Sequence, residues 1–327
     1  MTGTTITERP DCPYISVIVP AYNESDNVVP FLARLTDQLK RLPIRYEIIV
    51  VDDGSTDNTV QLLHQSGQTT DFKLIQLSRN FGKEAALTAG LDHAQGNAVI
   101  MIDADFQHPV EMIPEFLRFW RAGYDMVYGL RTDRKGESLR KRWLTEFFYR
   151  LLSRTSTTTI VPDAGDFRLL DRCAVEALKS LPERSRFMKG LYSWIGFKNI
   201  GIPFKVVQRQ AGHSKFSIHK LSKLAFNALI SFSELPLHIW VLVGALIALV
   251  SIFYALWVIT ETLIYGINVP GWATMTVGMF FLGGIQLLSI GILGEYISRI
   301  FIEVKGRPNY IVAKTSDFHD GKVAASS

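Results

Sequence analysis

Two aspartates that lie two residues apart, Asp103 and Asp105, directly follow the apolar segment NAVIMI. At the end of a strand, carboxylates with this spacing can hold one hard divalent cation, and Gln107 offers a further oxygen ligand. Such a cation can bridge two phosphates of a nucleotide diphosphate and neutralise the leaving group. The alternative is a solvated turn whose acidic residues cap the chain before Pro109.

A second polar segment follows the apolar run YISVIVP, which ends at Pro20. Tyr22, Asn23 and Glu24 come next, and an amide or carboxylate at this position can hydrogen-bond a base or a ribose. Residues of the same segment can instead cap the helix that we expect over residues 27–39.

Two further polar segments follow apolar runs in the same way. Asp53 and Gly54 end the run YEIIVVDDG, where the carboxylate can accept a hydrogen bond from a base N–H and the glycine lets the chain turn. Arg79 and Lys83 follow the run FKLIQLS and can pair with phosphate or support a base. Helix capping explains any one segment equally well, but four of them at successive strand ends favour a ligand site.

Apolar runs typical of strands alternate with segments of helical periodicity over the first two thirds of the chain. This alternation predicts an α/β fold with a mostly parallel sheet, and ligands bind such sheets beyond the carboxyl ends of the strands. We expect strands at residues 15–19, 46–54, 72–78, 97–105, 124–131 and 202–209, and helices at residues 27–39, 56–65, 83–94 and 110–122.

Charge and cysteine content restrict the class of function. The formal net charge of the 327 residues is only +4, so no bulk affinity for nucleic acid is expected. Cys12 and Cys173 lie far apart without metal-ligand spacing, which favours free thiols in a reducing compartment. Residues 1–14 are polar and lack the apolar region of a secretory signal, so we expect a flexible N-terminus. Residues 298–327 are expected to form a C-terminal tail that frays after about Asp317.

The last third of the chain has the composition of membrane helices. Residues 236–260 contain no Asp, Glu, Lys or Arg, and none occurs between Glu261 and Glu295. About 20 helical residues cross a bilayer core, so we expect transmembrane helices at residues 236–260 and 271–297. Two buried helices of a soluble protein are the alternative. Lys and Arg flank the pair but are missing from the loop between, so both chain ends are expected in the cytoplasm.

Basic and apolar residues are interleaved over residues 213–234, just before the first of these segments. This pattern predicts an amphipathic helix that lies in the membrane interface. A surface helix packed on the globular domain is the alternative.

In order and spacing, the segments VIVPAYNES, VVDDGSTDNT, SRNFGKEAALTAGLDHAQG and IDADFQHP resemble inverting family 2 glycosyltransferases of the GT-A fold, over residues 15–212. GDFRLLDR, ERSRFMKG and the ending LGEYISRIFIEVKGRPNY are similar to segments of bacterial bactoprenol (undecaprenyl phosphate) glucosyltransferases. Dolichyl-phosphate-mannose synthases resemble the chain more distantly. The resemblance implies a Rossmann-like GT-A catalytic domain, followed by the interfacial helix and the two membrane helices.

The resemblance also assigns roles to residues of this chain. Asp166 takes the position of the proposed catalytic base, as a proton acceptor or as a group that orients the sugar; an ion pair with Arg168 or Arg172 is the structural alternative. The expected ligands of Mg²⁺ or Mn²⁺ are Asp103, Asp105 and Gln107. The expected nucleotide-sugar-binding residues are Pro20, Tyr22, Asn23, Glu24, Asp53, Arg79, Lys83, Asp103 and Ala104. The residues expected at the lipid phosphate and the diphosphate are Arg131, Arg168, Arg209, Ser214 and Lys215.

By the same resemblance, the protein is expected to transfer a hexose from a UDP-sugar to undecaprenyl phosphate at the cytoplasmic face of the bacterial inner membrane. Glucose is the expected sugar; mannose, galactose and N-acetylhexosamine are alternatives. The product would be a lipid-linked donor for cell-surface glycan modification. The expected partners are the UDP-sugar, the lipid acceptor, the bilayer and further copies of the chain, a tetramer by resemblance.

Two rival functions are disfavoured by the residues present. A processive polysaccharide synthase carries a Q-x-x-R-W motif, but the Arg-Trp pair here, Arg142 and Trp143, has Leu139 in the Gln position. A non-catalytic membrane scaffold would not be expected to retain both Asp103 and Asp105.

Overall fold

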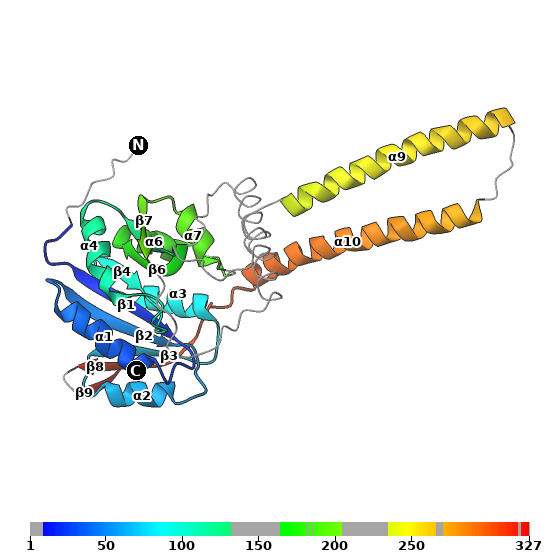
Figure 1. The fold of residues 1–327 in the computed structure, drawn as a ribbon. Coiled ribbons are helices and arrows are strands. Elements are labelled where there is room, and N and C mark those ends of the chain that lie inside the picture. The colour runs from blue at the N-terminus through cyan, green and yellow to red at the C-terminus, as the bar shows by residue number, and fades with distance from the viewer. Residues whose placement is uncertain are drawn as a thin grey trace. The chain divides into compact units, whose positions relative to one another are not determined.

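A computed structural model of the chain describes residues 9–131, 164–181, 183–184, 186–204, 235–265, 271–319 and 322–326. These residues form two units (Figure 1). The globular unit contains the described residues up to 204 together with residues 308–326, and the helical unit contains residues 235–307. The expected interfacial helix over residues 213–234 lies outside the described residues.

A nine-stranded sheet forms the centre of the described globular unit, in the order β7-β5-β6-β4-β1-β2-β3-β8-β9. β4, β1, β2 and β3 are parallel neighbours, as are β5 and β7, whereas β6, β8 and β9 run antiparallel to the strands they adjoin. The mostly parallel sheet is therefore as expected. The strands are β1 (Tyr14–Ala21), β2 (Arg45–Asp52), β3 (Phe72–Leu77), β4 (Ala98–Met101), β5 (Met126–Arg131), β6 (Ala164–Asp171), β7 (Asn199–Phe204), β8 (Val312–His319) and β9 (Lys322–Ser326).

Helices cover both faces of this sheet, which is why the middle of β1 is a continuous apolar run. On one face, Val17 joins a core that includes Phe31 of α1 and Phe116 of α4. On the other face, Gly90 of α3 approaches Ile18 so closely that a Cβ atom at this position would overlap with the isoleucine side chain. The helices of this unit are α1 (Val28–Lys40), α2 (Thr59–Ser66), α3 (Lys83–His93), the 3₁₀ turn η1 (Val110–Met112), α4 (Ile113–Arg121), α6 (Arg172–Ser180) and α7 (Met188–Trp194).

The C-terminal residues correct one prediction. β8 pairs antiparallel with β3, so the tail that was expected to fray after Asp317 is part of the sheet. Phe318 is fully buried, and its ring lies 5.0 Å from that of Phe72. The two strands are far apart in sequence, and no local pattern indicates their pairing. The globular domain therefore is not limited to residues 15–212.

The N-terminal prediction is also wrong for the residues that the structure describes. Arg9 Nη2 lies 2.9 Å from Asp125 Oδ1, and the guanidinium is 5.0 Å from the centre of the Trp120 ring. Tyr14 already begins β1. The flexible segment expected over residues 1–14 thus does not extend to these positions.

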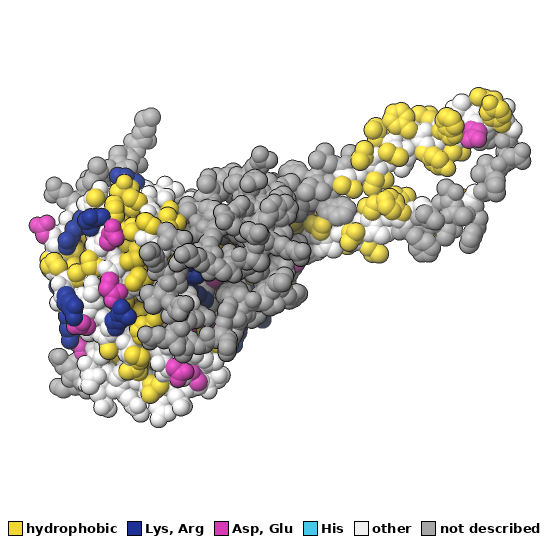
Figure 2. Space-filling view, viewed as in Figure 1, with side chains coloured by type: hydrophobic (Ala, Val, Ile, Leu, Met, Phe, Trp, Pro, Cys, Tyr) yellow, Lys and Arg dark blue, Asp and Glu magenta, His cyan; other side chains and the backbone are white. Residues whose placement is uncertain are grey.

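Two long helices, α9 (Leu235–Tyr265) and α10 (Trp272–Lys305), form the helical unit and contact each other. Figure 2 shows hydrophobic side chains along their surface, and Trp257 and Leu287 are 69% and 72% exposed. Among the described residues, one stretch, Phe281–Lys305, is long and apolar enough to cross a membrane. The first expected span, residues 236–260, lies within α9 and does not meet the same criterion over its described residues.

Candidate active site

The carboxyl ends of β1, β2 and β4 meet at one edge of the sheet, because these strands are parallel neighbours. Ala21 at the end of β1 is in register with Asp52 at the end of β2. β6 runs the opposite way, with Arg168 opposite Met101 of β4, so Asp166 near its start comes to the same edge. The topology thus brings Asp166 beside the acidic residues that follow β4.

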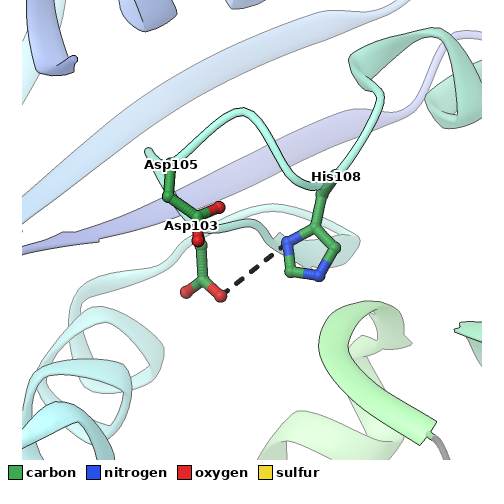
Figure 3. A group of neighbouring side chains, drawn as sticks. All are labelled: Asp103, Asp105 and His108. Carbon is green, nitrogen blue, oxygen red and sulfur yellow. Dashed lines mark ion pairs between the residues drawn. The ribbon is translucent and has the colours of Figure 1, made fainter. Parts of the chain in front are cut away.

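The loop after β4 brings three metal-ligating side chains together (Figure 3). Ligand atoms of Asp103, Asp105 and His108 all lie within 4.8 Å of one another. The backbone amide of Gln107 donates to Asp105 Oδ1 at 3.1 Å, which fixes this turn. Phe106 has a left-handed backbone with φ 58°, a strained conformation for a bulky residue, and its ring packs edge-on against a phenylalanine of α1.

His108 was not predicted as a site residue. Its ring is 3% exposed and is stacked 5.2 Å from Phe167, and Nδ1 lies 3.7 Å from Asp103 Oδ2. Within the described part of the chain, neither ring nitrogen has a hydrogen-bond partner. Burial lowers the pKa of His108, although the neighbouring aspartates oppose this effect. A neutral imidazole with a buried, unpaired nitrogen beside two carboxylates fits a divalent cation.

Lys83 joins the loop after β4 to β6. Its Nζ lies 2.7 Å from Asp103 Oδ1, 2.8 Å from Asp103 Oδ2 and 2.8 Å from Asp166 Oδ2. Burial lowers the pKa of Lys83, but the two carboxylates outweigh burial and hold this pKa above its usual value. In the structure this lysine, expected at the nucleotide-sugar, is the counter-ion of two site aspartates.

Asp53 holds the start of α3 in place. Its two carboxylate oxygens accept hydrogen bonds from the backbone amides of Phe81, at 2.7 Å, and Gly82, at 2.9 Å. Gly54, with φ 67°, lies against the backbone of Arg79, where a Cβ atom would be only 2.5 Å from the carbonyl carbon. The turn that the sequence predicts at this glycine is therefore confirmed, and no other residue fits there.

Asp52, the neighbour of Asp53, lies at the same polar strand end, but the sequence did not assign a role to it. It is 2% exposed, and only Oδ2 has a hydrogen-bond donor among the described residues, the backbone amide of Ser55 at 3.2 Å. Burial raises the pKa of this carboxyl. Its second oxygen, Oδ1, accepts no hydrogen bond from the described residues.

The other residues expected at the nucleotide-sugar mainly contact neighbouring parts of the protein. Asn23 Oδ1 accepts from the backbone amide of Thr56 at 2.8 Å, and the carbonyl of Glu24 accepts from the first amides of α1. Arg79 lies over the ring of Phe81, 4.0 Å from its centre. Tyr22 is 44% exposed at the edge of the sheet. Pro20 is partly buried in β1, and the side chain of Ala104 is buried.

The interior beside Asp166 is rich in charge. Burial raises the pKa of Asp166, but Lys83, Lys189 and Arg168 outweigh it and lower this pKa to about 2. Burial and the nearby Asp166 raise the pKa of Glu84 to about 7. Arg168 is only 4% exposed; its guanidinium lies 3.5 Å from the centre of a tyrosine ring of α7 and donates to a backbone carbonyl. This burial speaks against the contact with a lipid phosphate that was expected for Arg168.

Of the remaining predicted residues, the structure describes Arg131. Arg131 ends β5, and its Nη2 donates to Gln107 Oε1 at 3.2 Å, so the oxygen expected to bind metal is used by an arginine here. Arg209, Ser214 and Lys215 lie outside the described residues.

Comparison with known proteins identifies the family. Residues 16–179 match glycosyl transferase family 2, and residues 235–300 match the GtrB C-terminal hairpin. The chain belongs to glycosyl transferase family 2. This family 2 glycosyltransferase has the expected GT-A α/β fold, and the edge described above is where its four polar strand ends meet.

The similarity of this glycosyltransferase to curated proteins extends over nearly its whole length. It is 44% identical over 303 residues to the SfII prophage-derived bactoprenol glucosyl transferase of Shigella flexneri, covering 92% of this chain and 98% of the relative. It is 47% identical over 300 residues to an uncharacterized glycosyltransferase of Synechocystis, covering 91% and 94%. Among solved structures, it resembles glucosyl-3-phosphoglycerate synthase from Mycobacterium tuberculosis, with 20% identity, a TM-score of 0.46 and coverage of 66% and 77%.

Proposed function

We propose that this family 2 glycosyltransferase transfers glucose from UDP-glucose to undecaprenyl phosphate, with inversion at the anomeric carbon. The observation that carries the proposal is the 44% identity to a bactoprenol glucosyl transferase, because the match covers 92% of the chain. It therefore includes the C-terminal hairpin as well as the sugar-transfer domain. A protein that resembled these transferases only in its nucleotide-binding domain would not also match the C-terminal hairpin.

On the donor side, Asp103, Asp105 and His108 would hold Mg²⁺ or Mn²⁺, with Gln107 as a further oxygen donor once it leaves Arg131. When bound, the cation supplies positive charge that stabilises the departing UDP. A nitrogen ligand is accepted more readily by a transition metal, so the buried imidazole favours Mn²⁺ over Mg²⁺.

The nucleotide would lie over the ends of β1 and β2. Asp52 Oδ1 is supported as the acceptor for a base N–H, because both oxygens of Asp53 already accept from Phe81 and Gly82. Tyr22 offers an exposed ring next to it for stacking. This arrangement transfers the predicted role of Asp53 to its neighbour and leaves Asp53 to position the loop.

On the acceptor side, a phosphate oxygen of the lipid attacks the anomeric carbon, and the bond from this carbon to the UDP oxygen breaks. The phosphate is already an anion near neutral pH because its second pKa is about 6, so little proton transfer is needed. A pKa of about 2 makes Asp166 a weak base at neutral pH. We therefore assign Asp166 to orienting the sugar, one of the two roles left open by the sequence.

The membrane arrangement follows from the same proposal. α9 and α10 both cross the bilayer, and the chain ends and the active site face the cytoplasm, where UDP-glucose is present. Lys and Arg on both sides of the hairpin, and their lack in residues 262–294, support this orientation. Residues 213–234 would lie in the interface and bring Arg209, Ser214 and Lys215 to the lipid phosphate. A homo-oligomer, with a tetramer expected, remains part of the proposal.

The proposal is tested by the transfer of radiolabelled glucose from UDP-glucose to undecaprenyl phosphate, with wild-type protein and with Asp105→Asn. The substitution keeps the size of the side chain but removes its charge. It should lower metal-dependent transfer by about a hundredfold or more without unfolding the protein. Asp37→Asn, at an exposed position on α1, is the matched control and should transfer normally. Wild-type turnover in Asp105→Asn would exclude the metal site as assigned.

A further inference from the structure

We propose that Lys83 occupies the place of the metal on Asp103 in the ligand-free enzyme, and that it leaves Asp103 for the donor diphosphate when metal and nucleotide bind. Lys83 would thereby couple the binding of the two ligands. The inference rests on the proposed function, because it takes Asp103 as a metal ligand and a nucleoside diphosphate as the partner of the metal.

The first observation is that the ammonium of Lys83 lies within ion-pair distance of two site carboxylates. An ammonium has three N–H donors. Three carboxylate oxygens surround Nζ, both oxygens of Asp103 at 2.7 and 2.8 Å and Oδ2 of Asp166 at 2.8 Å. Both oxygens of Asp103 therefore lie next to the ammonium of Lys83.

A divalent cation cannot simply be added to this arrangement. A metal shared by Asp103, Asp105 and His108 would lie about 2.0 to 2.6 Å from an oxygen of Asp103. The ammonium of Lys83 is hydrogen-bonded to the same oxygen, so the two positive charges would repel each other at close range. Binding of the metal therefore favours a conformation in which Lys83 has turned away.

Lys83 can change its partner by a movement of its side chain alone, because the backbone next to it is held in place. Lys83 is the first residue of α3, and the amides just before it, of Phe81 and Gly82, are fixed by Asp53. The lysine side chain itself is 42% exposed, and its long flexible stem allows the ammonium to change partners. The segment is held, and only the charged group has to move.

The chemistry of the donor supplies the new partner. Among the described residues, the anions within ion-pair distance of Lys83 are Asp103 and Asp166. A diphosphate bound at this edge adds a third anion beside the N-terminus of α3, where negative charge is favoured. A metal ion alone displaces Lys83 from Asp103 without offering it another anion. When metal and nucleotide bind together, the diphosphate is that anion. The two ligands should therefore bind with positive coupling, and each should strengthen the other by the same factor.

The experiment measures Mn²⁺ binding to the purified full-length protein by the electron paramagnetic resonance signal of unbound Mn²⁺, with and without UDP. For wild-type protein, UDP should raise the Mn²⁺ affinity about tenfold or more. Lys83→Met should bind Mn²⁺ alone about fivefold or more tightly than wild type, and UDP should add less to it. Lys83→Arg keeps a cation at this position and should keep the weak binding of metal alone. Lys198→Met, the same change at an exposed position, should behave as wild type.

The inference is overturned if Lys83→Met binds Mn²⁺ alone no more tightly than wild type, or if UDP does not change the Mn²⁺ affinity of wild type. Should Lys83→Met fail to fold, as judged by its thermal unfolding, the wild-type measurement with Lys83→Arg decides. Asp105→Asn separates this inference from the proposed function. Equal Mn²⁺ binding by Asp105→Asn and wild type in the presence of UDP would refute the metal site itself. Loss of binding in Asp105→Asn with no effect of Lys83→Met would refute only the role of Lys83.

Discussion

The hydroxyl of Tyr310 donates a hydrogen bond to Asp92, with the oxygen atoms 2.7 Å apart. Asp92 lies near the end of α3, the helix that begins with Lys83, and Tyr310 lies between α10 and β8. The backbone amide of Ser78, just after β3, donates to the carbonyl of Ile311 at 2.9 Å. The residues that follow α10 thus form hydrogen bonds first with α3 and then with β3. The C-terminal strands are therefore part of the catalytic domain.

Replacement of Phe318 by Ala should strongly destabilise this domain. The ring is fully buried against Phe72 and His64, and a Cβ atom at Gly67 would overlap with it, so its removal leaves a cavity. We expect a loss of about 3 to 5 kcal/mol in the free energy of unfolding, measured by urea denaturation. His319→Ala, at the exposed neighbouring position, should change stability little. Equal stability of the two variants would contradict the buried position of Phe318.

A catalytic fragment that ends before α9 should therefore be unstable, although the sequence predicted a domain complete at residue 212. Such a fragment lacks β8 and leaves the edge of β3 unpaired. Residues 308–326 have to be retained, joined by a linker, in any test of the domain without its membrane helices.

Replacement of His108 by Phe should separate stability from function. Phe keeps an aromatic ring against Phe167 and removes two buried nitrogens that have no hydrogen-bond partner among the described residues. We expect the free energy of unfolding to stay the same or to rise by about 1 kcal/mol. Transfer in the presence of Mn²⁺ should fall about tenfold or more, because a metal ligand is lost. Unchanged transfer at every Mn²⁺ concentration would show that the imidazole does not bind the metal.

The sequence predicted which residues share the carboxyl edge of the sheet better than it predicted the contacts between their side chains. Parallel strands with polar residues after their last apolar position have a common carboxyl edge, so the grouping of Asp52–Asp53, Asp103 and Asp105 follows from local patterns. His108 belongs to the same loop and is a metal-ligating residue type, three residues after Asp105. This residue type at this spacing is the signal in the sequence that points to His108 as a metal ligand.

The contacts of Lys83 and Arg168 depend on long-range pairing instead. β6 joins β4 in antiparallel orientation across residues 132–163, and only this register brings Asp166 to Lys83. Arg168, two residues further along the same strand, points to the same face and becomes enclosed by Tyr128 and Tyr192. Arginine side chains are mostly exposed in folded proteins, and no pattern in the neighbouring sequence predicts that Arg168 is buried.

The carboxyl of Glu84 should make stability depend on pH. Its pKa is about 7, above the ordinary value of 4.5, because of burial and the nearby Asp166, while the Met188 amide, Lys83 and Lys189 oppose the shift. The folded state therefore binds the proton more tightly than the unfolded chain does. The contribution of Glu84 to stability should be largest below about pH 4.5 and should decrease as the pH rises through about 7.

Glu84→Gln should remove this part of the pH dependence, as measured by urea denaturation at about pH 5 and about pH 8. Asp166, with a pKa of about 2, is ionised throughout this range and does not contribute to the difference. An equal loss of stability between the two pH values in wild type and Glu84→Gln would contradict the raised pKa.

The central claim is the transfer of glucose to a polyprenyl phosphate. Purified full-length protein in detergent is incubated with undecaprenyl phosphate, Mn²⁺ and one radiolabelled sugar donor at a time: UDP-glucose, UDP-galactose, UDP-N-acetylglucosamine or GDP-mannose. Label from UDP-glucose should enter the lipid fraction at least about tenfold faster than label from the other donors, and only when undecaprenyl phosphate is present. Transfer of a different sugar in preference to glucose, or labelled lipid product without the phosphate acceptor, would contradict the account.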